Sequence, residues 1–108
     1  LHCLDFATGK LLWAVDTHRQ FDVRKGFFGA ACSPLVDGRA VILNIGGSKP
    51  PGLVAFERET GKVLWSASRG EASYSAPVAA MLGPLRIVLC LSTRSATSLP
   101  ISGVPGVR

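Results

Sequence analysis

The chain has 108 residues, of which 47% are hydrophobic and 18% charged, a composition typical of a small globular unit rather than of a disordered chain. Its longest charge-free stretch, residues 72–85, is interrupted by glycine and proline, which excludes a transmembrane helix. The net charge of +5 is spread along the chain without the clustered basic stripe of nucleic-acid binders, so we expect no nucleic acid among its partners.

An internal repeat organises the sequence. Residues 1–13 read LHCLDFATGKLLW and residues 53–65 read LVAFERETGKVLW, with six identities and one exchange of aspartate for glutamate. A weaker repeat relates residues 33–43 to residues 75–89, each with a proline, a turn and an aliphatic run. Both spacings are close to the length of one four-stranded propeller blade, about 40–50 residues. The repeat therefore predicts an all-β fold of antiparallel four-stranded blades of a β-propeller.

The predicted elements follow in chain order. Residues 1–17 form the C-terminal half of a first blade. Residues 30–67 form a complete second blade, with strands at about 30–36, 40–45, 53–57 and 62–67, and with an Asp-Gly hairpin turn after the first strand. Residues 74–91 begin a third blade. Residues 92–108 contain no acidic or aromatic residue and no further copy of the repeat, so we expect an atypical, disordered tail there.

The stronger repeat carries the signature Asp/Glu-x-x-Thr-Gly-Lys-x-Leu-Trp. Its residues are Asp5, Thr8, Gly9, Lys10 and Trp13 in the first repeat and Glu57, Thr60, Gly61, Lys62 and Trp65 in the second. The glycine suits a tight hairpin that needs a left-handed residue, and the acid and threonine oxygens can bond the exposed turn amides. A tryptophan at a fixed place on an outer strand needs a neighbouring sheet to cover its ring and an acceptor for its N–H. The signature therefore predicts a regular contact between neighbouring blades.

This signature resembles the tryptophan-docking motif of pyrroloquinoline-quinone-type (PQQ-like) β-propeller repeats, with Cys3 and Glu57 as departures from the usual alanine and aspartate. The resemblance covers about residues 1–91. It implies four-stranded antiparallel blades around an axis, about two blades of an incomplete ring, with each tryptophan docked against the adjacent blade. The family includes quinoprotein dehydrogenases and non-catalytic propellers such as the periplasmic scaffold of outer-membrane protein assembly.

Two functions follow from the resemblance. The first is a non-catalytic scaffold or binding module of the bacterial cell envelope, in the periplasm, whose partners are the remaining blades of a longer parent or another protein. The alternative is a fragment of a PQQ-dependent alcohol or sugar oxidoreductase with bound calcium. The family's enzymes carry a vicinal cysteine pair, which is absent here, and Asn44 and Asp37 are only single candidates for a calcium ligand. We therefore expect no catalytic residue, metal or cofactor in this chain.

Four residues outside the repeats form a candidate interaction loop: Arg24, Lys25, Phe27 and Phe28. The alternative, which we favour, is that the two rings cap the apolar space between blades. The cysteines Cys3, Cys32 and Cys90 lie in apolar runs without metal-ligand spacing, so we expect buried core thiols.

The two ends of the sequence bear on its completeness. The sequence starts with leucine, and its one methionine is Met81. Together with the tail that lacks the repeat, this start leads us to expect a piece of a longer propeller.

Overall fold

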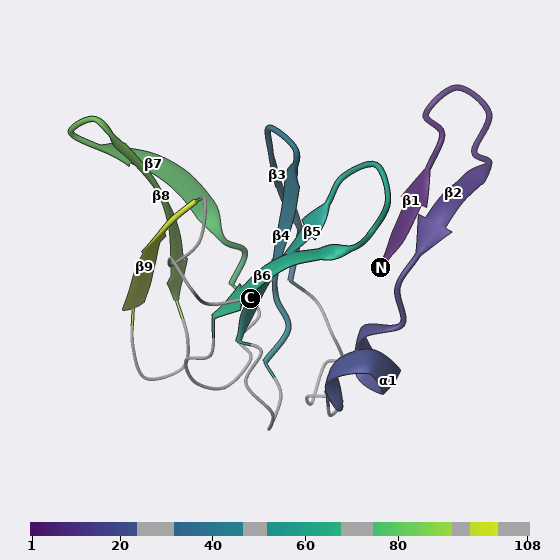
Figure 1. Ribbon diagram of the computed structural model, residues 1–108, viewed down its shortest axis with the longest axis horizontal. Coiled ribbons are helices and arrows are strands. Elements are labelled where there is room, and N and C mark those ends of the chain that lie inside the picture. The colour runs from purple at the N-terminus through teal and green to yellow at the C-terminus, as the bar shows by residue number, and fades with distance from the viewer. Residues whose placement is uncertain (24–31, 47–51, 68–74, 92–95, 102–108) are drawn as a thin grey trace.

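The computed structural model describes residues 1–23, 32–46, 52–67, 75–91 and 96–101, which form three antiparallel sheets side by side (Figure 1). Blade 1 consists of β1 (His2–Leu4) and β2 (Leu11–Ala14). Blade 2 consists of β3 (Leu35–Asp37), β4 (Ala40–Asn44), β5 (Leu53–Glu57) and β6 (Val63–Ala67), in that order. Blade 3 consists of β7 (Val78–Leu82), β8 (Leu85–Leu91) and β9 (Ala96–Pro100). The predicted all-β fold of incomplete propeller blades is confirmed.

Local sequence explains the hairpins. Gly38 and Gly83 have φ values of +56° and +59° in the β3–β4 and β7–β8 turns, a conformation that residues with a Cβ rarely adopt. The strands β4, β5 and β6 begin and end within one residue of the predicted ranges. Strand β3 begins at Leu35 rather than at residue 30, and residues 30–31 lie outside the described part.

Blade 2 is apolar on both faces, and both faces are covered. One face contacts blade 3, and its buried cluster consists of Ala40, Ile42, Leu53, Ala55 and Trp65 together with Val88 and Cys90 of β8. The opposite face consists of Val41, Leu43, Ile45, Val54 and Phe56, on which Leu1, Val15, Phe21, Val23 and Cys32 pack. Alternate residues of a strand point to opposite faces, so one continuous apolar run in β4 or β5 serves both neighbours. The core therefore lies on the two faces of blade 2, against blade 3 on one side and against residues that flank the strands of blade 1 on the other.

A short helix, α1 (Thr17–Phe21), follows blade 1 and was not predicted. It begins after Asp16, whose carboxylate accepts a hydrogen bond from the Arg19 amide at 3.2 Å, and it ends at Asp22, which adopts φ 52°. Its Phe21 ring meets Phe56 edge-on, with ring centroids 6.0 Å apart. The helix thus closes one end of the blade 2 face on which blade 1 packs. In the described part of the chain, no helix is long and apolar enough to cross a membrane.

The prediction of a disordered tail is wrong for residues 96–100, which form β9. Residues 96–100 pair with β8 in antiparallel register, from Ile87 opposite Pro100 to Leu91 opposite Ala96. The prediction was wrong for this segment because composition alone does not report an edge strand, for which β8 supplies the hydrogen-bonding template. Residues 92–95 and 102–108 of that tail lie outside the described part.

Replacing Phe56 with alanine tests how much the covered faces contribute. The Phe56 side chain is fully buried, so Phe56→Ala should lower the free energy of unfolding by about 3–5 kcal/mol in urea denaturation. Phe6→Ala is the matched control, because Phe6 is 106% exposed, and it should change stability by less than about 0.5 kcal/mol. Equal losses in the two variants would contradict the assignment of the core.

Candidate functional site

The first repeat forms a tight turn capped by its own aspartate. One carboxylate oxygen of Asp5 accepts hydrogen bonds from the amides of Ala7 (3.0 Å) and Thr8 (2.8 Å) and from the Thr8 hydroxyl (2.9 Å). The Thr8 hydroxyl in turn accepts from the Lys10 amide at 3.2 Å, and Gly9 has φ +72°. Three bonds to the ionised form, led by that from the Thr8 amide, lower the pKa of Asp5 below its ordinary value. The turn is thus held by side chains of its own repeat.

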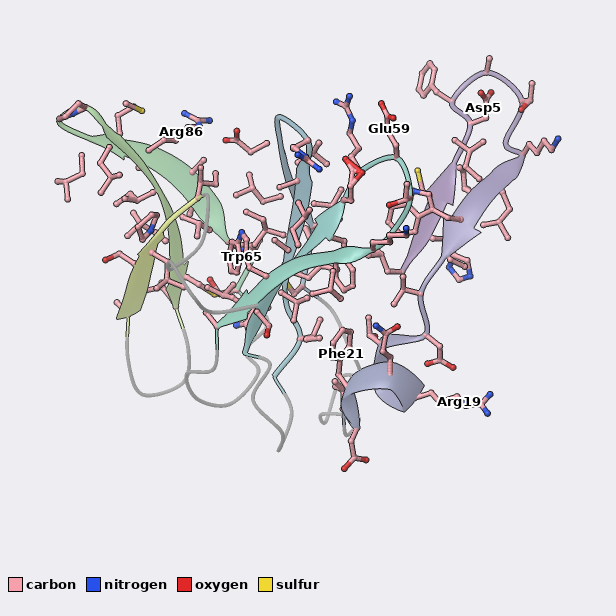
Figure 2. All side chains as sticks on the ribbon, viewed as in Figure 1. Asp5, Arg19, Phe21, Glu59, Trp65 and Arg86 are labelled. Atoms are coloured by element: carbon pink, nitrogen blue, oxygen red, sulfur yellow. The ribbon has the colours of Figure 1, made fainter. Side chains whose placement is uncertain are left out.

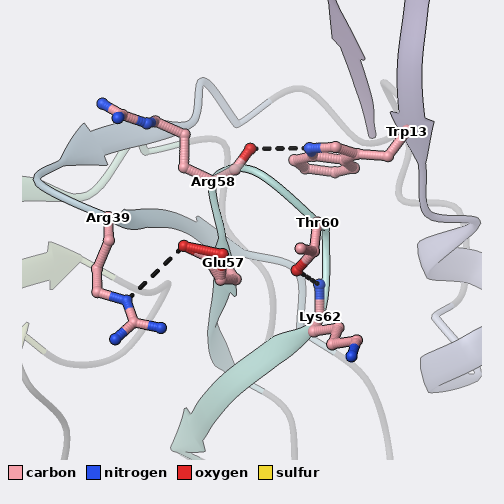
Figure 3. Close-up of polar contacts among 6 residues, drawn as sticks. All are labelled: Trp13, Arg39, Glu57, Arg58, Thr60 and Lys62. Atoms are coloured by element: carbon pink, nitrogen blue, oxygen red, sulfur yellow. Dashed lines mark hydrogen bonds and ion pairs between the residues drawn. The ribbon is translucent and has the colours of Figure 1, made fainter.

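The second repeat keeps the backbone of this turn but uses its acid differently (Figure 3). The Gly61 amide donates to the Glu57 carbonyl at 2.8 Å, as the Gly9 amide does to Asp5, and the Lys62 amide donates to the Thr60 hydroxyl at 3.3 Å. The longer glutamate side chain points away from the turn, and its carboxylate lies 3.7 Å from Nε of Arg39. Glu57 therefore joins the turn to the β3–β4 hairpin of its own sheet. Both signature lysines, Lys10 and Lys62, are exposed.

Trp13 joins blade 1 to blade 2. Its indole N–H donates to the Arg58 carbonyl at 2.8 Å, across the gap between the sheets (Figure 3). Its ring lies on Gly61, where an added Cβ would stand 2.6 Å from ring carbon Cε3. Position 61 requires glycine for two reasons. Its φ is +75°, and only a residue without a Cβ leaves room for the Trp13 ring. The tryptophan of one repeat therefore docks on the turn of the next.

Trp65 makes the corresponding contact with blade 3. The ring is 5% exposed and lies between the two sheets, as Figure 2 shows, and its N–H donates to the Ile101 carbonyl at 3.2 Å. Ile101 directly follows β9, as Arg58 directly follows β5. The backbone bonds match as well, since the Arg58 amide donates to the Arg39 carbonyl and the Ile101 amide to the Arg86 carbonyl. The hydrogen bond from the indole N–H to the residue after the neighbouring blade's third strand thus occurs twice, while the contact of a ring with a turn glycine is made by Trp13.

An ion pair between blades was missed by the sequence reasoning. Arg86 of β8 donates from Nε to the Asp37 carboxylate at 2.7 Å, and its Nη2 contacts the same oxygen. Asp37 lies at the end of β3, so the pair joins β3 of blade 2 to β8 of blade 3. This partnership with Asp37 raises the pKa of Arg86. The weak repeat placed both residues beside turns, but nothing in the sequence paired residues of different repeats.

The remaining candidates do not form a chemical centre in the described residues. Cys90 is buried, whereas Cys3 and Cys32 are half-buried, and all three are free thiols. Burial raises the pKa of both Cys32 and Cys90, which disfavours the reactive thiolate. Within the described ranges, no three His, Cys, Asp or Glu side chains are placed to hold a metal ion. The candidate interaction loop of Arg24, Lys25, Phe27 and Phe28 lies outside these ranges.

Repeated sheets joined by a docked tryptophan define a propeller-type repeat protein. Comparison with family models agrees: the model described as outer membrane protein assembly factor BamB matches residues 1–101. The chain belongs to this family of PQQ-like repeats. No curated protein and no solved structure matches the chain significantly.

The two turn glycines offer a matched test of docking. Gly61→Ala and Gly9→Ala impose the same left-handed strain, about 1–2 kcal/mol, but only at Gly61 does the new methyl group meet the Trp13 ring. We expect Gly61→Ala to cost at least about 1 kcal/mol more in chemical denaturation of dilute protein, and to change the tryptophan fluorescence. Equal losses with unchanged emission would show that Trp13 does not dock on Gly61.

The carboxylate of Asp5 makes a pH-dependent contribution to stability. Its pKa is lower in the folded chain than in the unfolded chain, so the stabilisation is present above the ordinary aspartate pKa and is lost as the pH falls through the folded value. In an NMR titration the Asp5 carboxyl should titrate below the ordinary value. Thr8→Ala should move the pKa part of the way back, because it removes the hydroxyl donor and keeps the amide donor. An unshifted Asp5 in the parent chain would refute the cap.

Proposed function

We propose that this chain is a non-catalytic PQQ-like repeat segment that acts as a scaffold or protein-binding module in the periplasm of a bacterial cell envelope. The observation that carries the proposal is the contact of Trp13 with Gly61 and the Arg58 carbonyl. The signature threonines and Asp5 bond within their own turns, and Trp13 and Gly61 make the contact between blades. The family's description as an outer membrane assembly factor supports a role in holding other proteins.

The proposed role depends on what surrounds the blades. In repeat proteins each unit contacts its neighbours, and binding uses the surfaces that neighbours leave open. The two middle strands of blade 2, β4 and β5, are buried on both faces, so they offer no binding surface. The partners we propose, the further blades of a longer parent or another protein, would meet the outer faces of blades 1 and 3 or the loops.

The test measures cofactor binding and turnover together. Purified parent protein would be dialysed against PQQ and calcium and then assayed for dye-linked oxidation of alcohols and sugars. We expect neither stoichiometric binding nor turnover, since the signature residues build the turns and the contact between blades. Stoichiometric PQQ with turnover would overturn the proposal in favour of an oxidoreductase.

Location is tested separately. A tagged parent protein should leave the cell on osmotic shock together with a periplasmic marker enzyme, while a cytoplasmic marker stays behind. Retention of the tag with the cytoplasmic marker would refute the envelope assignment and leave the test of catalysis unaffected.

A further inference from the structure

The turn between β3 and β4 is hydrogen-bonded in two directions. The Asp37 carboxylate, at the start of the turn, accepts a hydrogen bond at 2.7 Å from Nε of Arg86 in blade 3. The Arg39 carbonyl, at its other end, accepts from the Arg58 amide at 2.7 Å. The Arg58 carbonyl in turn accepts from the indole N–H of Trp13 in blade 1 at 2.8 Å (Figure 3). One hairpin turn of blade 2 is therefore linked to blade 3 and to blade 1.

The bonds continue in blade 3 to the second tryptophan. The Arg86 carbonyl accepts from the Ile101 amide at 3.0 Å, and the Ile101 carbonyl accepts from the indole N–H of Trp65 at 3.2 Å. Arg86 thus binds Asp37 with its side chain, while its backbone positions the residue that binds Trp65. An unbroken series of hydrogen bonds and one short turn therefore connects the two tryptophan contacts.

Arg39 and Arg86 hold the same place in their sheets but use their side chains differently. Each carbonyl accepts from the amide of the residue after the third strand of its blade. That third strand ends at Glu57 in blade 2 and at Pro100 in blade 3. The Glu57 carboxylate lies 3.7 Å from Nε of Arg39, whereas proline has no side-chain acceptor for Arg86. The Arg86 side chain instead crosses to Asp37, whose side chain is 16% exposed and needs a partner for its charge.

We propose that the β3–β4 turn couples the two tryptophan contacts, so that loss of the Asp37–Arg86 pair loosens Trp13 on the other side of blade 2. One residue separates Asp37 from Arg39, so a displacement of the first moves the carbonyl of the second. That carbonyl positions Arg58, which is the acceptor for Trp13. Coupling is reciprocal, so a protein bound to blade 3 at this turn would alter the Trp13 contact, and the reverse. The inference goes beyond the proposed function and does not rest on it.

Hydrogen exchange of the indole N–H groups measures the two contacts separately. The chain has two tryptophans, so its NMR spectrum contains two indole N–H signals, of which Trp13→Phe removes one. Arg86→Met keeps an unbranched side chain and removes every donor to Asp37. We expect exchange at Trp13, as well as at Trp65, to rise at least about fivefold. A rise at Trp65 alone would overturn the proposal, as would unchanged exchange at both.

Arg39→Met is the matched control, since it makes the same substitution at the equivalent place in blade 2. The Arg39 side chain is 75% exposed, and its contact with Glu57 lies within its own sheet. Exposed pairs of this kind contribute little, so exchange at both indoles should stay within about twofold of the parent chain. An equal rise in this variant would overturn the proposal, because the pair between blades would then not be the cause.

A double-mutant cycle separates coupling from a general loss of stability. Arg86→Met and Trp13→Phe, alone and together, would be compared by urea denaturation. Independent sites multiply their effects on the unfolding equilibrium constant within about twofold. We expect the effect of the double variant to be at least about threefold smaller than the product of the single effects. Multiplicative effects would overturn the proposal.

A second cycle shows whether any weakening of the contact between blades 2 and 3 has this result. Val88 is fully buried in that contact, and its side chain takes part in none of these hydrogen bonds. Val88→Ala and Trp13→Phe should therefore multiply within about twofold. A deviation equal to that of the Arg86 cycle would overturn the proposal, because the turn would then not be the route.

Discussion

The contact between the ring of Trp13 and the backbone of Gly61 sets the relation between blades. A flat ring against a bare backbone brings the sheets close at one fixed point, and the bond to the Arg58 carbonyl fixes the direction of approach. With the two sheets held at this point, Leu1, Val15 and Phe21 pack on the apolar residues of β4 and β5. The hydrophobic burial that stabilises the fold thus depends on Gly61, which has no side chain to hold the Trp13 ring away.

Comparison of the two turns shows which residues of the signature the turn requires and which can be exchanged. Asp5 caps its own turn, while Glu57 is one methylene longer and contacts Arg39 instead. Both turns nevertheless form the same glycine-to-acid backbone bond at 2.8 Å. The second turn therefore forms with the left-handed glycine and the threonine hydroxyl alone, and the Glu57 carboxylate contacts Arg39 instead of the turn amides. This explains why the exchange of aspartate for glutamate leaves the docking geometry of the second repeat intact.

Sequence reasoning succeeded where a local structure, such as a tight turn or a buried strand, requires a particular type of residue. The repeated glycine, threonine and tryptophan predicted the hairpins, and the aliphatic runs predicted β4 and β5 because these strands are buried on both faces. It failed at β9, whose Ala-Thr-Ser-Leu-Pro sequence has no strand pattern of its own and takes its form from β8 and Trp65. It also failed at α1, which has five residues, too few for helical periodicity, and depends on Asp16 and Asp22. The Arg86–Asp37 pair escaped because its members lie in different repeats.

Docking in this chain has a direction. Each tryptophan lies on the last strand of its blade and reaches forward to the next blade, so a blade offers a ring on one side and a turn on the other. Two such ends cannot meet through a two-fold axis, because like faces would bring ring to ring or turn to turn. A stack of blades built in this way either closes into a ring or keeps one open turn and one open apolar face. In the part of the chain that the structure describes, no ring lies on the turn at Gly9, and leucines of blade 3 are exposed. The two surfaces differ chemically: the first is a turn with a left-handed glycine, and the second is a sheet face of exposed aliphatic side chains.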